Sequence, residues 1–193
     1  PNGDLVALFN AEGATPYGYG MVKLDKNSEV IWTYPGKVHH DMDVEEDGTI
    51  WATVHEFRNL QKNPLPGGPN WTKRILADYI VKLSKSGREL KRVSLADVVT
   101  QYEKTDLMRS WFWGEAKWDY LHVNDVDVIH EEFAKHHDFA EAGQVMFSSR
   151  SLSAVGLVDM QKEELVWIKR GFWKKQHDPD ALPNGNIMLF DNR

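Results

Sequence analysis

The sequence predicts an all-β fold, a β-propeller whose blades each contain four antiparallel strands. A glycine turn followed by an apolar, β-prone run occurs four times, at residues 2–6, 47–51, 142–146 and 184–188. Asn-Gly and Asp-Gly before such a run are strong hairpin signals, because glycine supplies the positive φ that the turn needs. Short strands that repeat in one hairpin order are typical of propeller blades.

Two further strand patterns follow the turns in a fixed order, and a histidine segment opens three of the units. The first pattern lies at 21–25, 80–84 and 156–159. The second follows a polar turn and lies at 29–32, 89–93 and 164–167. The units then contain three, four, four and two strands. The chain thus holds about three and a half blades, and it starts and stops inside a blade. We expect it to be part of a larger propeller rather than a small closed one.

We expect one domain over residues 1–193, with insertions at 58–76, 94–120 and 131–142. The first is rich in Pro and Gly. The second is expected to hold a short helix before Trp111, Phe112, Trp113 and Trp118, and the third has a helical pattern. Long insertions on a rigid scaffold often form lids over a site. The alternative is that the tryptophans only pin the second insertion to the blades.

The composition excludes several classes of function. The net charge is −6, with 23 basic and 29 acidic residues and no Lys/Arg block, which argues against nucleic acid or an anionic membrane as partner. The absence of cysteine excludes disulfides and thiol catalysis. No apolar run reaches the ~20 residues of a membrane span. The first residues already read as the middle of a repeat, so we expect a longer protein around this chain.

His40, His122 and His177 open the three histidine segments, and each is followed three residues later by an aspartate. The first strand of a propeller blade lies nearest the central axis, so these histidines are expected to converge at one end of the tunnel. Converging imidazoles can hold a metal, with nearby aspartates as further ligands. They can also act as nucleophile, acid and base. The alternative is three structural histidines.

An arginine after a strand could supply the fixed charge that an anionic substrate needs, and Arg150 has this position. A set of short motifs, taken in their order along the chain, resembles the motifs of the bacterial arylsulfate sulfotransferases and their arylsulfotransferase-like relatives. The matching motifs are His39-His40-Asp41, His122-Val123-Asn124, Ser148-Ser149-Arg150, Gln176-His177, Pro183-Asn184-Gly185-Asn186 and Phe190-Asp191-Asn192.

This resemblance implies a six-bladed propeller that moves a sulfuryl group from an aryl sulfate to a phenol, without a nucleotide sulfate donor. It implies that His177 is the nucleophile and forms a sulfohistidine. His40, His122 and Arg150 would complete the catalytic set, and no metal or other cofactor is required. Asn124 and His39 would contribute to substrate binding. His40 is preferred to His39 for the catalytic role because it aligns with His177 in the repeat.

The resemblance also implies a periplasmic or secreted protein whose partners are small molecules, an aryl sulfate and a phenol. A homo-oligomer or the remaining blades would complete the propeller. Two other functions are compatible with the residues. One is a non-catalytic propeller that binds a sulfated or other anionic ligand, and the other is a scaffold for protein partners with the aromatic insertions as its interface.

Overall fold

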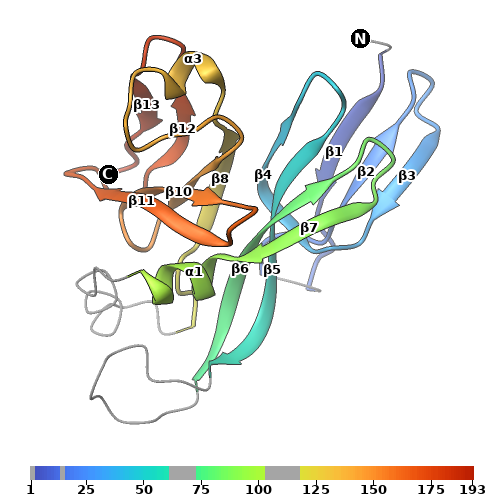
Figure 1. The fold of residues 1–193 in the computed structure, drawn as a ribbon. Helices are drawn as coiled ribbons and strands as arrows, with labels where there is room; N and C mark the ends of the chain where they lie inside the picture. Colours follow the sequence, from blue (N-terminus) through green and yellow to red (C-terminus); the bar gives the residue numbers. More distant parts are fainter. Residues whose placement is uncertain (1–2, 14–15, 61–72, 103–117) are drawn as a thin grey trace.

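The computed structural model describes residues 3–13, 16–60, 73–102 and 118–193, and it is all-β apart from short helices (Figure 1). The described strands form four antiparallel sheets that follow one another along the chain. The first sheet contains β1 (Leu5–Phe9), β2 (Gly20–Leu24) and β3 (Val30–Tyr34). The second contains β4 (Val38–Val44), β5 (Ile50–Leu60), β6 (Lys73–Leu83) and β7 (Glu89–Ser94).

The third sheet contains β8 (Val123–Val128), β9 (Val145–Ser149), β10 (Ala154–Asp159) and β11 (Glu164–Arg170). The fourth contains β12 (His177–Ala181) and β13 (Ile187–Phe190). Three, four, four and two strands are the numbers that the sequence predicts, and each sheet pairs its strands in chain order. The described sheets are open, and none of them closes on itself.

The four glycine turns have the predicted role. Gly3, Gly48, Gly143 and Gly185 lie just before β1, β5, β9 and β13, with φ of 85°, 85°, 86° and 86°. These are left-handed conformations that a side chain would strain. The same turn therefore precedes β1 and opens the second strand of each of the other three sheets, which confirms the strand repeat read from the sequence.

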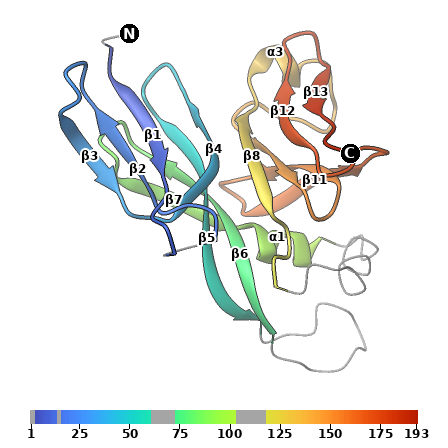
Figure 2. The ribbon, with the colours of Figure 1, turned by 180° about the vertical axis from the view of Figure 1, so that it is seen from behind.

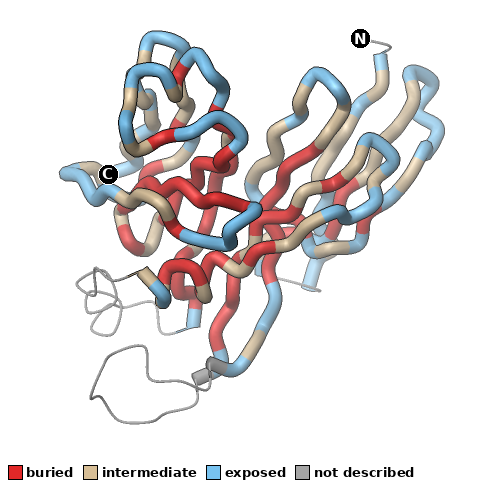
Figure 3. Tube along the Cα trace, in the orientation of Figure 1, coloured by how far each residue is buried: buried red, intermediate tan, exposed pale blue. Residues whose placement is uncertain are grey.

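Each pair of successive sheets shares its own hydrophobic core. One cluster joins the first two sheets, with Met21 and Val81 among its members. The largest cluster joins the second and third sheets, where Ile80, Leu121 and Phe147 are fully buried. A third cluster links the third sheet to β12 and β13. Buried segments accordingly run through the middle of the molecule, and its outer loops are exposed (Figure 3).

The first strands of the last three sheets pack side by side, β4 against β8 and β8 against β12 (Figures 1 and 2). Aspartates on one strand accept hydrogen bonds from backbone N–H groups of the next, and we call these contacts the aspartate bonds. They run from Val126 to Asp41 (3.1 Å), from Val128 to Asp43 (3.0 Å) and from Ala181 to Asp127 (2.8 Å).

The insertions differ partly from expectation. β5 and β6 continue to Leu60 and from Lys73, so strand structure occupies both ends of the expected 58–76 insertion. The 94–120 insertion begins with the expected helix, α1 (Leu95–Gln101), whose N-cap Ser94 accepts the Asp97 N–H. Trp111, Phe112 and Trp113 lie outside the described residues. No described helix is long and apolar enough to cross a membrane.

The third insertion contains a helix, as its pattern predicts, but this helix, α3 (Glu131–Ala134), covers only its first four residues. Turns and irregular chain make up the rest. The ring Nε2–H of His137 donates to the carbonyl oxygen of Gly185 at 2.6 Å, which fixes the insertion on the β12–β13 turn. The insertion follows the C-terminal end of β8, whereas His122 precedes the N-terminal end. A six-residue strand, ~20 Å long, separates the two. This insertion is therefore no lid over the histidines.

Candidate functional site

The registers of the hairpins show which residues of β4, β8 and β12 are equivalent. In each hairpin, the last residue of the first strand pairs with the second residue after the turn glycine. These pairs are Val44–Ile50, Val128–Val145 and Ala181–Ile187. Counting back four residues from each pair reaches His40, Asn124 and His177. Counting forward from Val38 and Val123, which both pair with the sixth residue after the turn glycine, reaches His39 and Asn124 instead. The β4 bulge holds one residue more than the β8 bulge, so both His39 and His40 correspond to this position.

His122 lies two residues earlier than that position, so placing all three histidines at one repeat position is wrong for His122. It directly precedes the β8 bulge, as Lys37 precedes that of β4, and both residues have a left-handed φ, of 48° and 53°. A bulge inserts residues into one strand only, so a fixed His-x-x-Asp spacing no longer reports one structural position.

The three histidines nevertheless lie close together, with His40 next to each of the other two, and we call this set the histidine row. The ring centroids of His40 and His122 are 5.1 Å apart. His40 also shares a pocket of about 360 Å³ with His177, and Asn124 is part of its lining. His40 is exposed, whereas His39 is only 2% exposed and bonds to His40 through the two Nδ1 atoms at 2.7 Å.

His122 is oriented by Asp119, a residue that the sequence did not single out. Its Nδ1 lies 2.5 Å from Asp119 Oδ2, and the same oxygen accepts the Tyr17 hydroxyl at 2.6 Å. Because a carboxylate accepts, the Nδ1 atom of His122 carries the proton. The Nε2 atom is then available for proton transfer. Burial and the hydrogen bond to Asp119 raise the pKa of Tyr17, so its hydroxyl remains a donor.

The ring of Tyr17 is the centre of this cluster. It lies 4.8 Å from the His122 ring and 5.4 Å from the His40 ring. Its neighbour Gly18 lets the chain approach β4 closely, since a Cβ there would meet the carbonyl oxygen of Val38 at 2.0 Å. No pattern near Tyr17 announces this position, because its partners lie in other sheets.

Arg150 stands beside His122. Its backbone N–H donates to the His122 carbonyl oxygen at 3.1 Å, and its charge acts to lower the pKa of Tyr17 against the larger opposing effects. Arginine keeps its charge in any protein environment, so Arg150 supplies a fixed positive charge at this end of the row. Sequence reasoning therefore selected residues that the fold brings together, namely His40, His122, His177, Asn124 and Arg150.

The histidines deep in the cluster are neutral. Burial, followed by the field of His122, lowers the pKa of His39 to about 4. Although part of His40 is exposed, desolvation by the rings packed against it, followed by the fields of His39 and His122, also lowers its pKa. Burial and then the charge of Asp119 raise the pKa of Asp78 to about 8. The 3.3 Å contact of His39 Nε2 with Asp78 Oδ1 is therefore one between neutral groups at pH 7.

His55 is a second residue that sequence reasoning missed. It lies opposite Asp78 in the β5–β6 register, 1% exposed, and its ring centroid is 4.9 Å from that of His39. Neither ring nitrogen has a hydrogen-bond partner among the described residues. A signal for both residues was present in the sequence, because each is a polar residue that follows a largely apolar run of a strand. His55 follows Trp51 to Val54, and Asp78 follows Ile75 to Ala77.

The local contacts of His177 fix its tautomer. Nδ1 lies 2.9 Å from the carbonyl oxygen of Lys175, which can only accept, so Nδ1 carries the proton and Nε2 has the free lone pair. The neighbouring Asn124 is 5% exposed and donates its Nδ2–H to the Gln176 carbonyl oxygen at 2.8 Å. Its Oδ1 atom has no partner within the described part of the chain.

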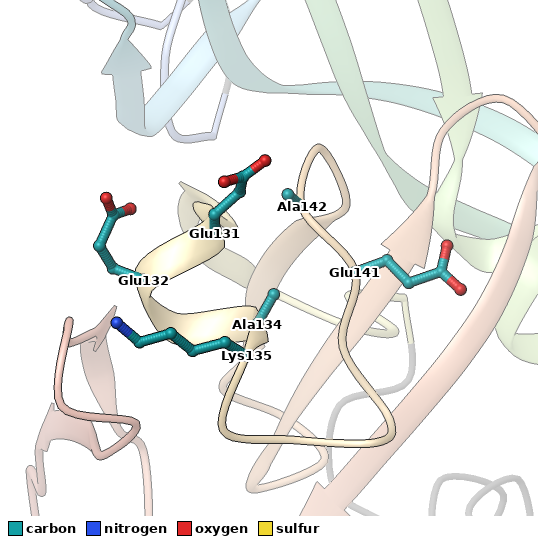
Figure 4. Close-up of a pocket in the computed structure, with 6 residues that line it drawn as sticks. All are labelled: Glu131, Glu132, Ala134, Lys135, Glu141 and Ala142. Atoms are coloured by element: carbon teal, nitrogen blue, oxygen red, sulfur yellow. The ribbon is translucent and has the colours of Figure 1, made fainter.

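The described residues offer no metal site, and a second pocket differs from the histidine row in its lining. Within the described ranges, no group of three or more His, Asp or Glu side chains is arranged to hold a metal ion. A separate pocket of about 450 Å³ lies between α3 and the loop that follows it (Figure 4). Glu131, Glu132 and Glu141 line it, with Lys135 as the cation. This acidic lining repels anions, and the pocket lacks a histidine.

The comparisons with known proteins point to one family. The family model of the arylsulfotransferases (ASST) matches residues 1–193 of the chain. The searches of curated proteins and of solved structures give no match.

Proposed function

Because the chain belongs to the arylsulfotransferase (ASST) family, we propose that it moves a sulfuryl group from an aryl sulfate donor to a phenolic acceptor, through a sulfohistidine at His177. The observation that carries this proposal is the row of His122, His40 and His177, with the fixed charge of Arg150 beside it. No nucleotide sulfate donor takes part.

In the first half-reaction, the Nε2 lone pair of His177 attacks sulfur, and the bond between sulfur and the aryl oxygen breaks. The leaving oxygen keeps the electron pair and takes a proton from Nε2 of the His122 imidazolium. The Nδ1–H of His122 stays bonded to Asp119, whose charge stabilises that imidazolium. The products are the released phenol and a sulfuryl group bonded to His177.

In the second half-reaction, neutral His122 takes the proton of the acceptor phenol at Nε2. The phenol oxygen attacks sulfur, and the N–S bond to His177 breaks with its electron pair returning to Nε2. Arg150 and an imidazole N–H can stabilise the charge on the sulfuryl oxygens in both steps. The cycle ends with His177 and His122 in their starting protonation states.

Aromatic side chains next to the row support an aryl substrate. The Trp118 ring stacks near Tyr17, with centroids 6.4 Å apart and an interplanar angle of 14°. Trp118 is 44% exposed, as is Phe57, whose ring centroid lies 6.1 Å from it. Exposed rings of this kind stack on aryl groups. We assign this surface to the aryl part of the donor and acceptor.

We further propose that the four sheets are part of a six-bladed propeller. The repeated aspartate bonds support this, because Asp178 and Asp180 occupy the acceptor positions on β12 and accept no hydrogen bond from the described residues. They offer acceptors to the backbone N–H groups of a further first strand. A structure of the full-length gene product with fewer than six sheets around one axis would contradict this arrangement.

The family typically works outside the cytoplasm, and we propose a periplasmic or secreted location for this protein. An export signal in the full-length gene product would support this location. A full-length product without one would count against this location.

The test of the reaction uses 4-nitrophenyl sulfate with and without phenol as acceptor. Nitrophenolate release that depends on the acceptor supports transfer, whereas binding without release supports the non-catalytic anion-binding alternative. Mass spectrometry after quenching with donor alone should show one sulfuryl adduct on His177. His177→Ala should abolish release, while Arg150→Lys should keep the charge and lose ~10²–10³-fold in rate. An adduct at another residue would refute the assigned nucleophile.

A further inference from the structure

The aspartate bonds have the same spacing between each pair of neighbouring first strands. Each first strand carries an Asp-x-Asp pair at equivalent positions, 41 and 43 on β4, 125 and 127 on β8, and 178 and 180 on β12. Both aspartates of β4 accept N–H groups from β8, at Val126 and Val128. Of the β8 pair, Asp127 accepts the N–H of Ala181, the equivalent of Val128.

Asp125 is the exception, and the residue opposite it explains why. By the same spacing it faces residue 179, the equivalent of Val126, and residue 179 is a proline. Proline has no backbone N–H. The Asp125 Oδ2 atom is accordingly buried without a hydrogen-bond partner among the described residues, and the whole residue is only 5% exposed.

The charges that act most strongly on Asp125 are all negative. Its own strand contributes Asp127, β4 contributes Asp41, and β12 contributes Asp178 and Asp180. A carboxylate that lacks an N–H donor and is surrounded by other carboxylates is strongly disfavoured in a buried position. Asp41 and Asp178 also line the pocket between His40 and His177, so this charge bears on the candidate site.

We propose that Asp125 is a neutral carboxylic acid in the native protein at pH 7, and that Pro179 makes it so by withholding the N–H that its equivalents receive. Asp125 is then a pH-sensitive positioning residue at the β8–β12 contact, next to the strand that carries His177. When it loses its proton at alkaline pH, repulsion from Asp41 and Asp178 weakens this contact. This inference does not depend on the proposed sulfuryl transfer.

The pH range follows from the physical causes. Burial, and after it the charge of Asp41, raises the pKa of Asp125 to about 9, whereas an unfolded aspartate ionises near ~3.9. Between these values the native state holds one proton that the unfolded chain releases. The stabilisation from Asp125 is thus fully present below the unfolded value and is lost as the pH rises toward 9.

The experiment compares urea unfolding of the wild-type chain and Asp125→Asn from pH 5.5 to 8.5. Asparagine has the same shape and no charge, so the ratio of the two unfolding constants, wild type over variant, should rise about tenfold per pH unit. Unfolding of the wild type should also release one more proton than unfolding of the variant. A ratio that does not change with pH would overturn the proposal.

Asp127→Asn is the matched control on the same strand. Burial raises the pKa of Asp127 to only about 6 because Ala181 supplies its N–H, so the corresponding ratio should be constant from pH 6.5 to 8.5. Pro179→Ala restores an N–H opposite Asp125 and should flatten the pH dependence. An unchanged slope in Pro179→Ala would show that proline is not the cause.

A spectroscopic measurement on the wild type covers the case in which a variant does not fold. Infrared difference spectra should show the C=O band of a protonated carboxyl group at pH 7 that disappears as the pH passes 9. Buried Asp78, with a pKa raised to about 8 by burial and Asp119, contributes a band of its own that is lost at lower pH. A single titrating band near 8 would contradict a protonated Asp125.

Discussion

The hydroxyl of Tyr17 donates a hydrogen bond to the Oδ2 atom of Asp119 at 2.6 Å, across 102 residues of sequence. The same oxygen receives the Nδ1–H of His122. A residue that precedes β2 therefore helps to fix the tautomer and direction of a histidine at the start of β8. The first and third sheets share one hydrogen-bonded chain.

Tyr17→Phe removes this hydroxyl and keeps the ring among the imidazoles. Hydrogen bonds to charged groups contribute about 1.5–3 kcal/mol, and part of that loss should appear as poorer orientation of His122. We expect kcat for sulfuryl transfer to fall about tenfold, with a smaller change in KM. Steady-state kinetics with the nitrophenyl donor measures both constants.

Tyr34→Phe is the control for stability. The Tyr34 hydroxyl also donates to a carboxylate, that of Glu89, but it lies in the cluster between the first two sheets. Its removal should lower the free energy of unfolding by a similar amount and leave kcat unchanged. Equal losses of kcat in the two variants would show that Tyr17 acts only through stability.

Trp118→Ala tests the aryl surface. Truncation removes an exposed ring that stacks near Tyr17, so we expect KM for the phenolic acceptor to rise about tenfold with little change in kcat. Phe172→Ala provides the control, because Phe172 is 83% exposed and contacts Trp173 and Arg193 rather than the histidines. An unchanged KM in Trp118→Ala would place the aryl group elsewhere.

The strand repeat could be predicted from the sequence because each of its signals lies within a few consecutive residues. Gly48 and its equivalents need a left-handed φ, and each apolar strand follows such a turn directly. The motifs around His40, His177 and Arg150 also lie in single segments. What the patterns missed depends on packing between segments. Tyr17 reaches Asp119 from another sheet, and no spacing announces a contact of that range.

The register error at His122 has a different origin. The His-x-x-Asp spacing matched three segments, but the bulges of β4 and β8 contain different numbers of inserted residues. The β4 shift spans Val38 to Met42, whereas that of β8 spans Val123 to Val126. Sequence spacing counts residues along a strand, and structural equivalence is set by the partner strand. Asn124 is therefore the β8 residue that matches His177, and the longer β4 bulge brings both His39 and His40 to the corresponding position.

His55→Leu should stabilise the protein, and more so in acid. The ring of His55 is 1% exposed and lacks a hydrogen-bond partner among the described residues, and burial, then His39, lowers its pKa to about 4. An unfolded histidine has a pKa near ~6.5, so between these values the unfolded chain binds a proton that the native state rejects. The stability of the wild type therefore falls as the pH drops below 6.5. Leucine fills a similar volume without that cost.

At pH 7 we expect the free energy of unfolding of His55→Leu to exceed that of the wild type by about 1 kcal/mol, from the buried polar atoms that are removed. At pH 5 the linked proton adds about 2 kcal/mol to the difference. Urea unfolding at the two pH values measures both. The same substitution at the exposed His136 is the control, because that ring is in contact with water in both the native and the unfolded state. A difference for His55→Leu that shrinks toward pH 5 would mean that His55 is charged in the native protein, contrary to this prediction.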